Sequence, residues 1–137
     1  MEPIKIEITI LKPVQKVWDY MNDPKHITKW NYANDQWHCP TAENDLRVGG
    51  KLKARMEAKD KSFGFDFEST YDEIIPFKLI KSHLPDGRNI EFLFNEIDAT
   101  TTQVVQIFDP EGLESREMQR EGQYAILNNF HKYVENN

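Results

Sequence analysis

Residues 117–135, EMQREGQYAILNNFHKYVE, carry one long apolar stripe near the end of this 137-residue chain. Within the stripe the apolar or small positions recur every four residues, the spacing of one face of an amphipathic α-helix: Met118, Gly122, Ile126, Phe130 and Val134. Ser115 stands just before the stretch and is a residue type that suits the N-cap. A helix over 115–135 would be about 30 Å long at about 1.5 Å per residue. It is long enough to cross a whole β-sheet.

The start of the chain predicts one strand and two short helices. Alternating isoleucines over residues 4–11 are typical of a half-buried strand. Pro13 suits a first helical position, and the next apolar residues have helical spacing up to Met21. Asp23 as N-cap, followed by Pro24, opens a second short helix that ends near Trp30.

From Gly49-Gly50 onward the period of the apolar residues is two, which indicates strands. Ile75-Pro76 interrupts the pattern, and Asp86-Gly87 is typical of a tight hairpin turn. The expected strands cover residues 51–58, 65–72, 77–84, 90–95 and 101–108. Such short connections join antiparallel neighbours, so we predict a five-stranded meander with strand 4–11 at one edge. The fold class is therefore α+β, with residues 1–137 in a single domain.

Composition excludes several classes of function. The net charge of −6, with 29% charged residues and no run of Lys or Arg, argues against a nucleic-acid partner. A single cysteine forms no internal disulfide, and the N-terminus lacks the features of a secretion signal. No apolar run approaches the roughly eighteen residues of a membrane span. We expect a soluble cytoplasmic protein, either a monomer or a homodimer, without a cofactor.

The stretch 30–40, WNYANDQWHCP, gathers two tryptophans with the only cysteine. His38-Cys39 supplies two potential metal ligands, fewer than the three or four that zinc sites use, so no metal site is predicted. Neighbours in an extended segment point to opposite sides, which argues against a Cys-His nucleophile pair. Two interpretations stay open for Trp30 and Trp37. They either close one end of the core, with Cys39 buried beneath, or line the mouth of an apolar pocket.

Aromatic residues on one side of the expected strands face the apolar side of the long helix. A fully packed core and a cavity both fit this pattern. Gly122 in the middle of the helix costs about 0.5–1 kcal/mol relative to alanine and suggests either close approach or room for a ligand. Ser69, Glu73 and His83 fall on the same predicted inward face, where they could orient a ligand head group.

No sequence motif indicates enzyme chemistry. Serine-hydrolase, phosphate-loop, zinc-protease and dinucleotide-binding patterns are missing from the sequence. Glu73 with His83 is the one acid–base pairing that adjacent strands suggest. We therefore predict no catalytic residues.

Several strings, in order along nearly the whole chain, resemble one family. They are AENDLRVGGKLKARMEAKD (42–60), FGFDFESTYDEIIP (63–76), DGRNIEF (86–92), FDPE (108–111) and EMQREGQYAILNNFHKYVE (117–135). The order of elements resembles the helix-grip, or START-like (SRPBCC), fold, and the strings resemble its branch named for the activator of Hsp90 ATPase, the AHSA1-like family. The resemblance implies a curved antiparallel sheet wrapped around the C-terminal helix, with a cavity between them.

Many relatives with this fold bind apolar small molecules in the cavity, and a few branches act on polyketides. The resemblance therefore implies binding of a small apolar or amphipathic molecule. The alternatives are a protein-interaction module with a chaperone partner, and a cyclase- or hydrolase-like enzyme. The residues expected to line the cavity are Trp30, Trp37, Met56, Phe65, Phe67, Ser69, Tyr71, His83, Phe92, Phe94, Met118, Gly122, Tyr124, Ile126 and Phe130.

The chain departs from the family pattern in two ways. Where the family shows Gly-Trp-Gln in the last helix, this chain has Gly122-Gln123-Tyr124, so the aromatic ring is displaced by roughly 100° around the helix. We expect the cavity wall to differ here. The sequence also resembles only the C-terminal half of the eukaryotic co-chaperone, so direct activation of Hsp90 is not expected.

Overall fold

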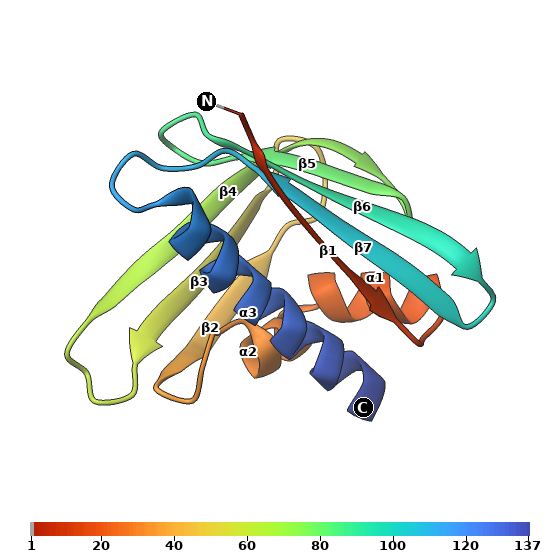
Figure 1. Ribbon diagram of the computed structural model, residues 1–137, viewed down its shortest axis with the longest axis horizontal. Coiled ribbons are helices and arrows are strands. Elements are labelled where there is room, and N and C mark those ends of the chain that lie inside the picture. The colour runs from red at the N-terminus through yellow and green to blue at the C-terminus, as the bar shows by residue number, and fades with distance from the viewer. Residues whose placement is uncertain (1) are drawn as a thin grey trace.

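The computed structural model describes residues 2–137, which contain three helices and one seven-stranded antiparallel sheet (Figure 1). The elements are β1 (Ile4–Ile10), α1 (Val14–Asn22), α2 (Pro24–Trp30), β2 (Trp37–Asn44), β3 (Lys51–Ala58), β4 (Gly64–Ile75), β5 (Leu79–His83), β6 (Asn89–Asp98), β7 (Thr101–Phe108) and α3 (Arg116–Asn136). The strand order is β1-β7-β6-β5-β4-β3-β2. The strands β2 to β7 thus form a meander, and β1 returns to pair with the last strand.

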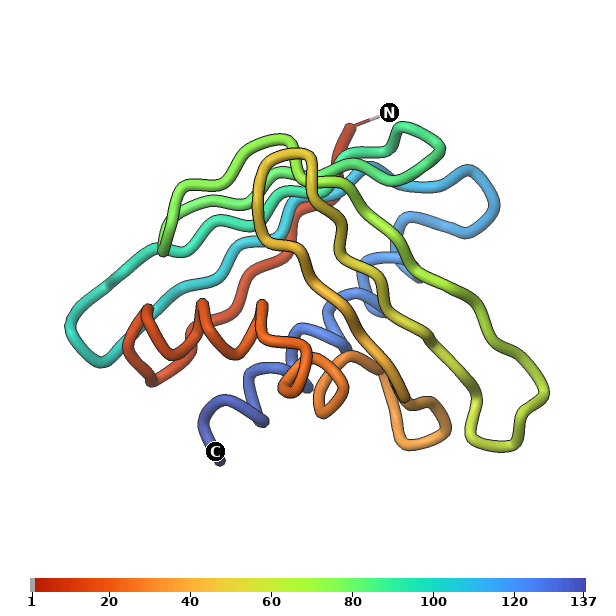
Figure 2. Tube along the Cα trace, turned by 180° about the vertical axis from the view of Figure 1, so that it is seen from behind, coloured from red at the N-terminus to blue at the C-terminus, as the bar shows by residue number. Residues whose placement is uncertain are grey.

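The sheet curls into two wings, and α3 runs along its concave side (Figures 1 and 2). We call β2, β3 and β4 together the β2–β4 wing. The other wing holds β5, β6, β7 and β1. The helices α1 and α2 pack near the C-terminal end of α3, with α1 against β6 and β7 and α2 against β2. This arrangement confirms the predicted α+β class and the helix-grip fold.

The capping residues predicted from the sequence perform that role. The side chain of Asp23 accepts a hydrogen bond from the backbone N–H of Lys25, and Pro24 occupies the first turn of α2. The hydroxyl of Ser115 accepts from the backbone N–H of Met118 at 3.1 Å. Both caps satisfy N–H groups that have no partner within their own helix. No helix in residues 2–137 is long and apolar enough to cross a membrane.

The edge strand β2 was not among the strands predicted from the sequence, which began at residue 51 after the strand over 4–11. Its pairing with β3 is interrupted by a register shift between His38 and Thr41, and the exposed Pro40 lies within that shift. A proline donates no backbone hydrogen bond, and a bulge breaks the alternation of inward and outward side chains. These two irregularities hide the strand from a search for period two.

The break between β4 and β5 was predicted correctly, but the strand that follows it starts later than predicted. The chain breaks its ladder after Ile75, as expected at Ile75-Pro76, but the next strand begins at Leu79 rather than at residue 77. Phe77 sits in the connecting turn with a φ of 65°, a left-handed conformation outside any strand. The strand β5 is therefore shorter than predicted.

The helix α3 is buried along its C-terminal half only. Leu127, Phe130 and Val134 are at most 3% exposed and pack in the main core. Met118, near the N-terminus of the same helix, is 60% exposed. The backbone of α3 packs chiefly on β1 and also on α1 and α2. The C-terminal half of α3 is thus packed in the core, while its N-terminal half is more exposed to solvent.

Candidate functional site

Most of the predicted cavity residues share the concave side of the sheet. Cross-strand partners lie on one face, and the pairs Met56–Phe65, Ala54–Phe67 and Ile80–Phe92 place these side chains together on the inner face. Buried members of the predicted set are Trp30, Met56, Ser69, Tyr71, Phe94 and Phe130. Partly buried members that pack against the core are Trp37, Phe67, Phe92 and Ile126. Whether they also line a cavity stays a prediction.

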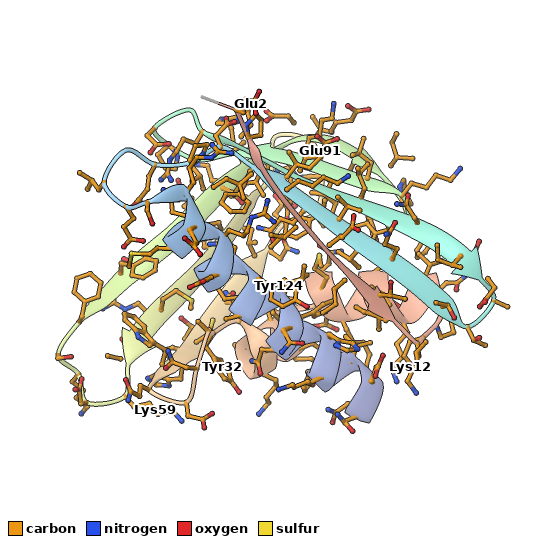
Figure 3. The ribbon with its side chains drawn as sticks, in the orientation of Figure 1. Glu2, Lys12, Tyr32, Lys59, Glu91 and Tyr124 are labelled. Atoms are coloured by element: carbon orange, nitrogen blue, oxygen red, sulfur yellow. The ribbon has the colours of Figure 1, made fainter. Side chains whose placement is uncertain are left out.

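Four further members of the predicted set lie in the open. Phe65 is 44% exposed and Met118 is 60% exposed. A methyl group built on Gly122 would meet no atom within 4 Å, so this glycine is not there for close approach of another element. Tyr124 is also exposed, but it lies beside Lys5 and Glu7 of β1, on the flank of α3 away from the β2–β4 wing (Figure 3).

His83 and Glu73 do not face the concave side, and the prediction that they do is wrong. A register shift between Tyr71 and Glu73 reverses the alternation of β4, so that Glu73 turns outward and lies 3.8 Å from Lys81. The inward residue of β5 is Ser82, and His83 contacts Asp72 at 2.9 Å on the outer face. The acid–base pair suggested by the sequence is therefore not formed.

Trp30 closes one end of the core. Its ring packs edge-to-face on Phe130 with the centroids 4.8 Å apart, and its indole N–H donates to the carbonyl of Tyr20 at 2.9 Å. The side chain of Asn129 in α3 donates to the carbonyl of Trp30 at 2.8 Å. These contacts fix the end of α2 to α1 and α3. They support the structural interpretation of Trp30.

Trp37 has a different environment, at the tip of the β2–β4 wing. Its ring lies 5.9 Å from Phe63 and 6.2 Å from Phe65, centroid to centroid. Phe63 is 60% exposed, so this aromatic cluster is open to solvent on one side. Trp37 also packs against the main core, so its role at the mouth of a pocket stays a prediction.

His38 and Cys39 point to opposite sides, as expected. The imidazole of His38 lies 3.6 Å from the carboxylate of Glu57. The buried Cys39 thiol donates to the carbonyl of Thr41 at 3.4 Å, and burial raises its pKa. A raised pKa makes the thiolate scarce near neutral pH, so Cys39 behaves as a small apolar group.

Neutral polar groups lie among the apolar residues of the concave face, and only Ser69 was predicted from the sequence. Ser69, Ser82 and Gln106 are 2%, 6% and 6% exposed. Each points inward, on the same face of its strand as the apolar residues two positions away. The Nε2 group of Gln106 donates to Oε1 of Gln123 in α3 at 3.2 Å. Ser82 and Gln106 could have been found by extending the period of two from Ile80 and Val104.

The hydroxyl of Tyr71 is anchored within this face. It donates to Oδ1 of Asn44 in β2 at 2.6 Å. Burial raises the pKa of Tyr71 to about 12. Among the residues described, the buried polar side chains of the core are serine, threonine or glutamine, without a charged group. The interior thus offers hydrogen bonds but no counter-ion.

Two open grooves lie elsewhere on the surface. The larger has a volume of about 820 Å³ and runs between β1 and α3; it is lined by Lys5, Ile6, Glu7, Arg120, Glu121, Tyr124, Ala125 and Asn128. The smaller, of about 430 Å³, lies at the turn between β2 and β3 and is lined by Glu43, Asn44, Asp45, Gly49, Gly50, Lys51 and Lys53. Neither groove coincides with the predicted cavity.

The family model described as activator of Hsp90 ATPase homolog 1-like protein matches residues 12–135. The chain belongs to the AHSA1-like family. An AHSA1-like protein from Aeromonas hydrophila, solved by NMR, is 36% identical, with 97% of this chain and 93% of that chain covered and a TM-score of 0.87. A protein from Cytophaga hutchinsonii is 43% identical over 98% of this chain and 92% of its own, with a TM-score of 0.84.

More distant solved structures share the fold alone. A crystal structure from Chromobacterium violaceum is 19% identical, with 98% and 99% of the two chains covered and a TM-score of 0.85. A comparison with curated proteins gives no match.

Proposed function

We propose that this AHSA1-like chain binds a small, mostly apolar and uncharged molecule between the concave face of the β2–β4 wing and the N-terminal half of α3. The observation that carries the proposal is the contrast along α3. Its C-terminal half is buried, whereas Met118 is exposed and Gly122 faces open space. Exposed apolar surface on a folded protein marks a candidate site for a ligand or a partner protein.

The rim of the proposed site is aromatic. Phe65 and Trp37 stand at the tip of the β2–β4 wing, with Phe63 as their neighbour. Flat rings offer a large apolar area at low conformational cost, which suits an aromatic or polycyclic ligand. Met118 of α3 is exposed, and its flexible side chain can adapt to different ligand shapes.

The polar groups of the site indicate the class of ligand. Ser69 of the β2–β4 wing is neutral, as are Ser82 and Gln106 on the concave face of the other wing, and the charged groups of β3 and β4 pair with one another on the outer face, as Lys51 does with Glu68. A carboxylate brought to this face would lose its hydration without gaining a counter-ion, which is costly. Ketone, hydroxyl or amide groups match it better.

Native mass spectrometry of the protein from its own host, followed by thermal-shift screening, tests the proposal. The probes are a flavonoid-like aromatic, a small neutral polyketide and a fatty acid. We expect a co-purified mass or an increase of several degrees in Tm with a neutral aromatic probe, because a ligand that binds only the folded state raises Tm. An empty protein that no probe stabilises contradicts ligand binding.

The exposed cluster of Trp37, Phe63 and Phe65 also fits a second function, contact with a protein partner. The family is named for a chaperone activator, so Hsp90 is the partner to test by pull-down. Replacement of Phe63 by serine should weaken such a contact without unfolding the chain, since Phe63 is 60% exposed. A catalytic function is not proposed, because Glu73 and His83 lie outside the site with other partners.

A further inference from the structure

Four apolar side chains form a continuous row on the outer face of the sheet, which we call the apolar row. They are direct cross-strand partners: Val105 of β7 with Leu93 of β6, Leu93 with Leu79 of β5, and Leu79 with Ile75 of β4. The residue beside each of them in its strand packs in the core, so the apolar row points to the opposite side. The row is about 14 Å long, since neighbouring strands lie about 4.8 Å apart.

No helix of residues 2–137 packs over the apolar row. Figures 1 and 2 show α1, α2 and α3 on the concave side of the sheet, where their buried residues join the core. Ile75 is 41% exposed, and Leu79 and Leu93 are half-buried among their neighbours in the sheet. Val105 is 4% exposed, between Leu93 on one side and Glu7 of β1 on the other. A contiguous apolar patch on an otherwise polar surface marks a site of interaction.

A row of charged side chains runs beside the apolar row on the same face. Glu91 of β6 lies opposite Lys81 of β5, and Lys81 lies opposite Glu73 of β4. The ammonium group of Lys81 is 3.8 Å from the Glu73 carboxylate, and both side chains are about half exposed. Glu91 lies on the side of the sheet away from α3 (Figure 3). An occupant of the apolar row therefore also meets these charges.

We propose that the apolar row packs against the apolar row of a second copy of this chain, with a two-fold axis that runs parallel to the strands between β5 and β6. In this arrangement Leu79 of each copy lies on Leu93 of the other, and Ile75 lies on Val105. Stacked sheets lie about 10 Å apart, a spacing that such side chains fill. The same surface is then used by both copies, as in most dimers.

The charges favour this arrangement over others that superpose the two rows. With the axis between β5 and β6, Lys81 of each copy lies opposite Glu91 of the other, which makes the interface complementary in charge. An axis along β6 would place two Glu91 carboxylates opposite each other, and an axis along β5 would do the same with two Lys81 ammonium groups. An axis along the apolar row itself would set Glu91 opposite the uncharged Asn95.

Analytical ultracentrifugation and NMR spectra, both over a concentration series up to about 1 mM, test the dimer without any substitution. We expect a dimer that dissociates on dilution, because so short an apolar row gives an interface at the small end of specific ones. The backbone amide signals of Leu79 and Leu93 should shift with concentration, whereas those of β2 and β3 should not. A monomer at the highest concentration, or shifts confined to another surface, overturns the proposal.

Two single variants test which residues face each other across the interface. Leu79→Lys and Leu93→Glu each set a charge against a leucine of the partner, and we expect the dissociation constant to rise by about tenfold or more in either variant. An equimolar mixture of the two variants should associate much more tightly than either alone. In the mixed dimer the two new charges meet each other, and the two remaining leucines meet.

The matched control is Leu113→Lys, at a 94% exposed position in the connection between β7 and α3, which should leave the dimer unaltered. Thermal melting of each variant shows whether the monomer is folded. If a leucine variant is unfolded, Lys81→Glu takes its place, since this exposed side chain should weaken the dimer by facing Glu91 of the partner with a like charge. Equal association of all variants, or a mixture that associates no better than its components, contradicts the proposed arrangement.

Discussion

Gln106 in β7 and Gln123 in α3 hydrogen bond through their side-chain amides, with Nε2 of Gln106 donating to Oε1 of Gln123 at 3.2 Å. The pair links the sheet to the helix on the concave side. In the family pattern the position of Gln123 holds tryptophan, and the aromatic residue of this chain, Tyr124, lies on the outer flank instead. Position 123 thus holds a polar amide that bonds to the sheet, where the sequence resemblance implies an indole.

Restoring the family residue should therefore close the proposed site. We expect Gln123→Trp to weaken ligand binding at least tenfold, because the indole fills the space beneath α3 and removes the amide. Isothermal titration with the probe that gives the largest thermal shift measures the effect. Tyr124→Ala is the matched control, since it removes an outer ring from the next position. If Gln123→Trp binds the probe as well as the natural chain, the ligand lies elsewhere.

The contrast between the halves of α3 predicts that replacing a side chain by alanine lowers the free energy of unfolding much more in the C-terminal half than in the N-terminal half. Phe130 is fully buried and packs on Trp30, so Phe130→Ala should lower the free energy of unfolding by about 3–5 kcal/mol. Met118 is 60% exposed, and Met118→Ala should change it by no more than about 0.5 kcal/mol. Urea denaturation of both variants measures the difference. Similar losses at the two positions would mean that the N-terminal half of α3 is packed more tightly than its exposure indicates.

The parts of the fold that follow strict periods were predictable from the sequence. The alternating isoleucines of β1 predicted a half-buried strand, because such a strand repeats with period two, and the meander of the later strands left it a place at an edge. Asp23 and Ser115 marked helix starts, since their side chains satisfy the first free N–H groups. Irregularities defeated the same reasoning. The bulge at Pro40 removed the period of two by which β2 would have been recognised. The bulge after Tyr71 turned the side chain of Glu73 from the inner to the outer face of the sheet.

The candidate site was less predictable than the fold. Burial of an aromatic residue such as Phe94 follows from its place on an inward face. The importance of Gln106 depends on Gln123, seventeen residues away on another element, and no local pattern records that contact. The position of Tyr124 on the outer flank follows from the rotation of α3 about its axis, which tertiary packing sets.

His26 makes stability depend on pH. Its Nδ1 lies 2.8 Å from the hydroxyl of Tyr133, and its ring stacks on Tyr20 at 3.9 Å. Burial lowers the pKa of His26 below the ordinary value of 6.5, against the opposing effect of Asp23. The unfolded chain therefore binds the proton more readily than the folded one, so stability is lost as the pH falls below 6.5.

Urea midpoints between about pH 5 and 8 measure this dependence, because histidine titrates there. We expect His26→Gln to show a smaller loss of stability on acidification than the natural chain. The difference between the two slopes isolates His26 from the carboxylates, which both chains share. Equal slopes would show that His26 is protonated as easily in the folded chain as in the unfolded one.

Tyr71 should be the last tyrosine to ionise. Burial raises its pKa to about 12, although the bond to Asn44 acts in the opposite direction. The unfolded side chain ionises near pH 10, so the stability that this group contributes is present below about pH 10 and is lost as the pH rises toward 12. Absorbance of tyrosinate during an alkaline titration follows each of the five tyrosines.

The variant Tyr71→Phe assigns the late step, which matters because burial also raises the pKa of Tyr133. We expect the step near pH 12 to disappear in this variant while the earlier steps remain. Tyr133→Phe is the matched control and should leave the late step in place. A late step that survives in Tyr71→Phe would mean that water reaches the hydroxyl of Tyr71 on the concave face, and that the interior is more open than its 4% exposure indicates.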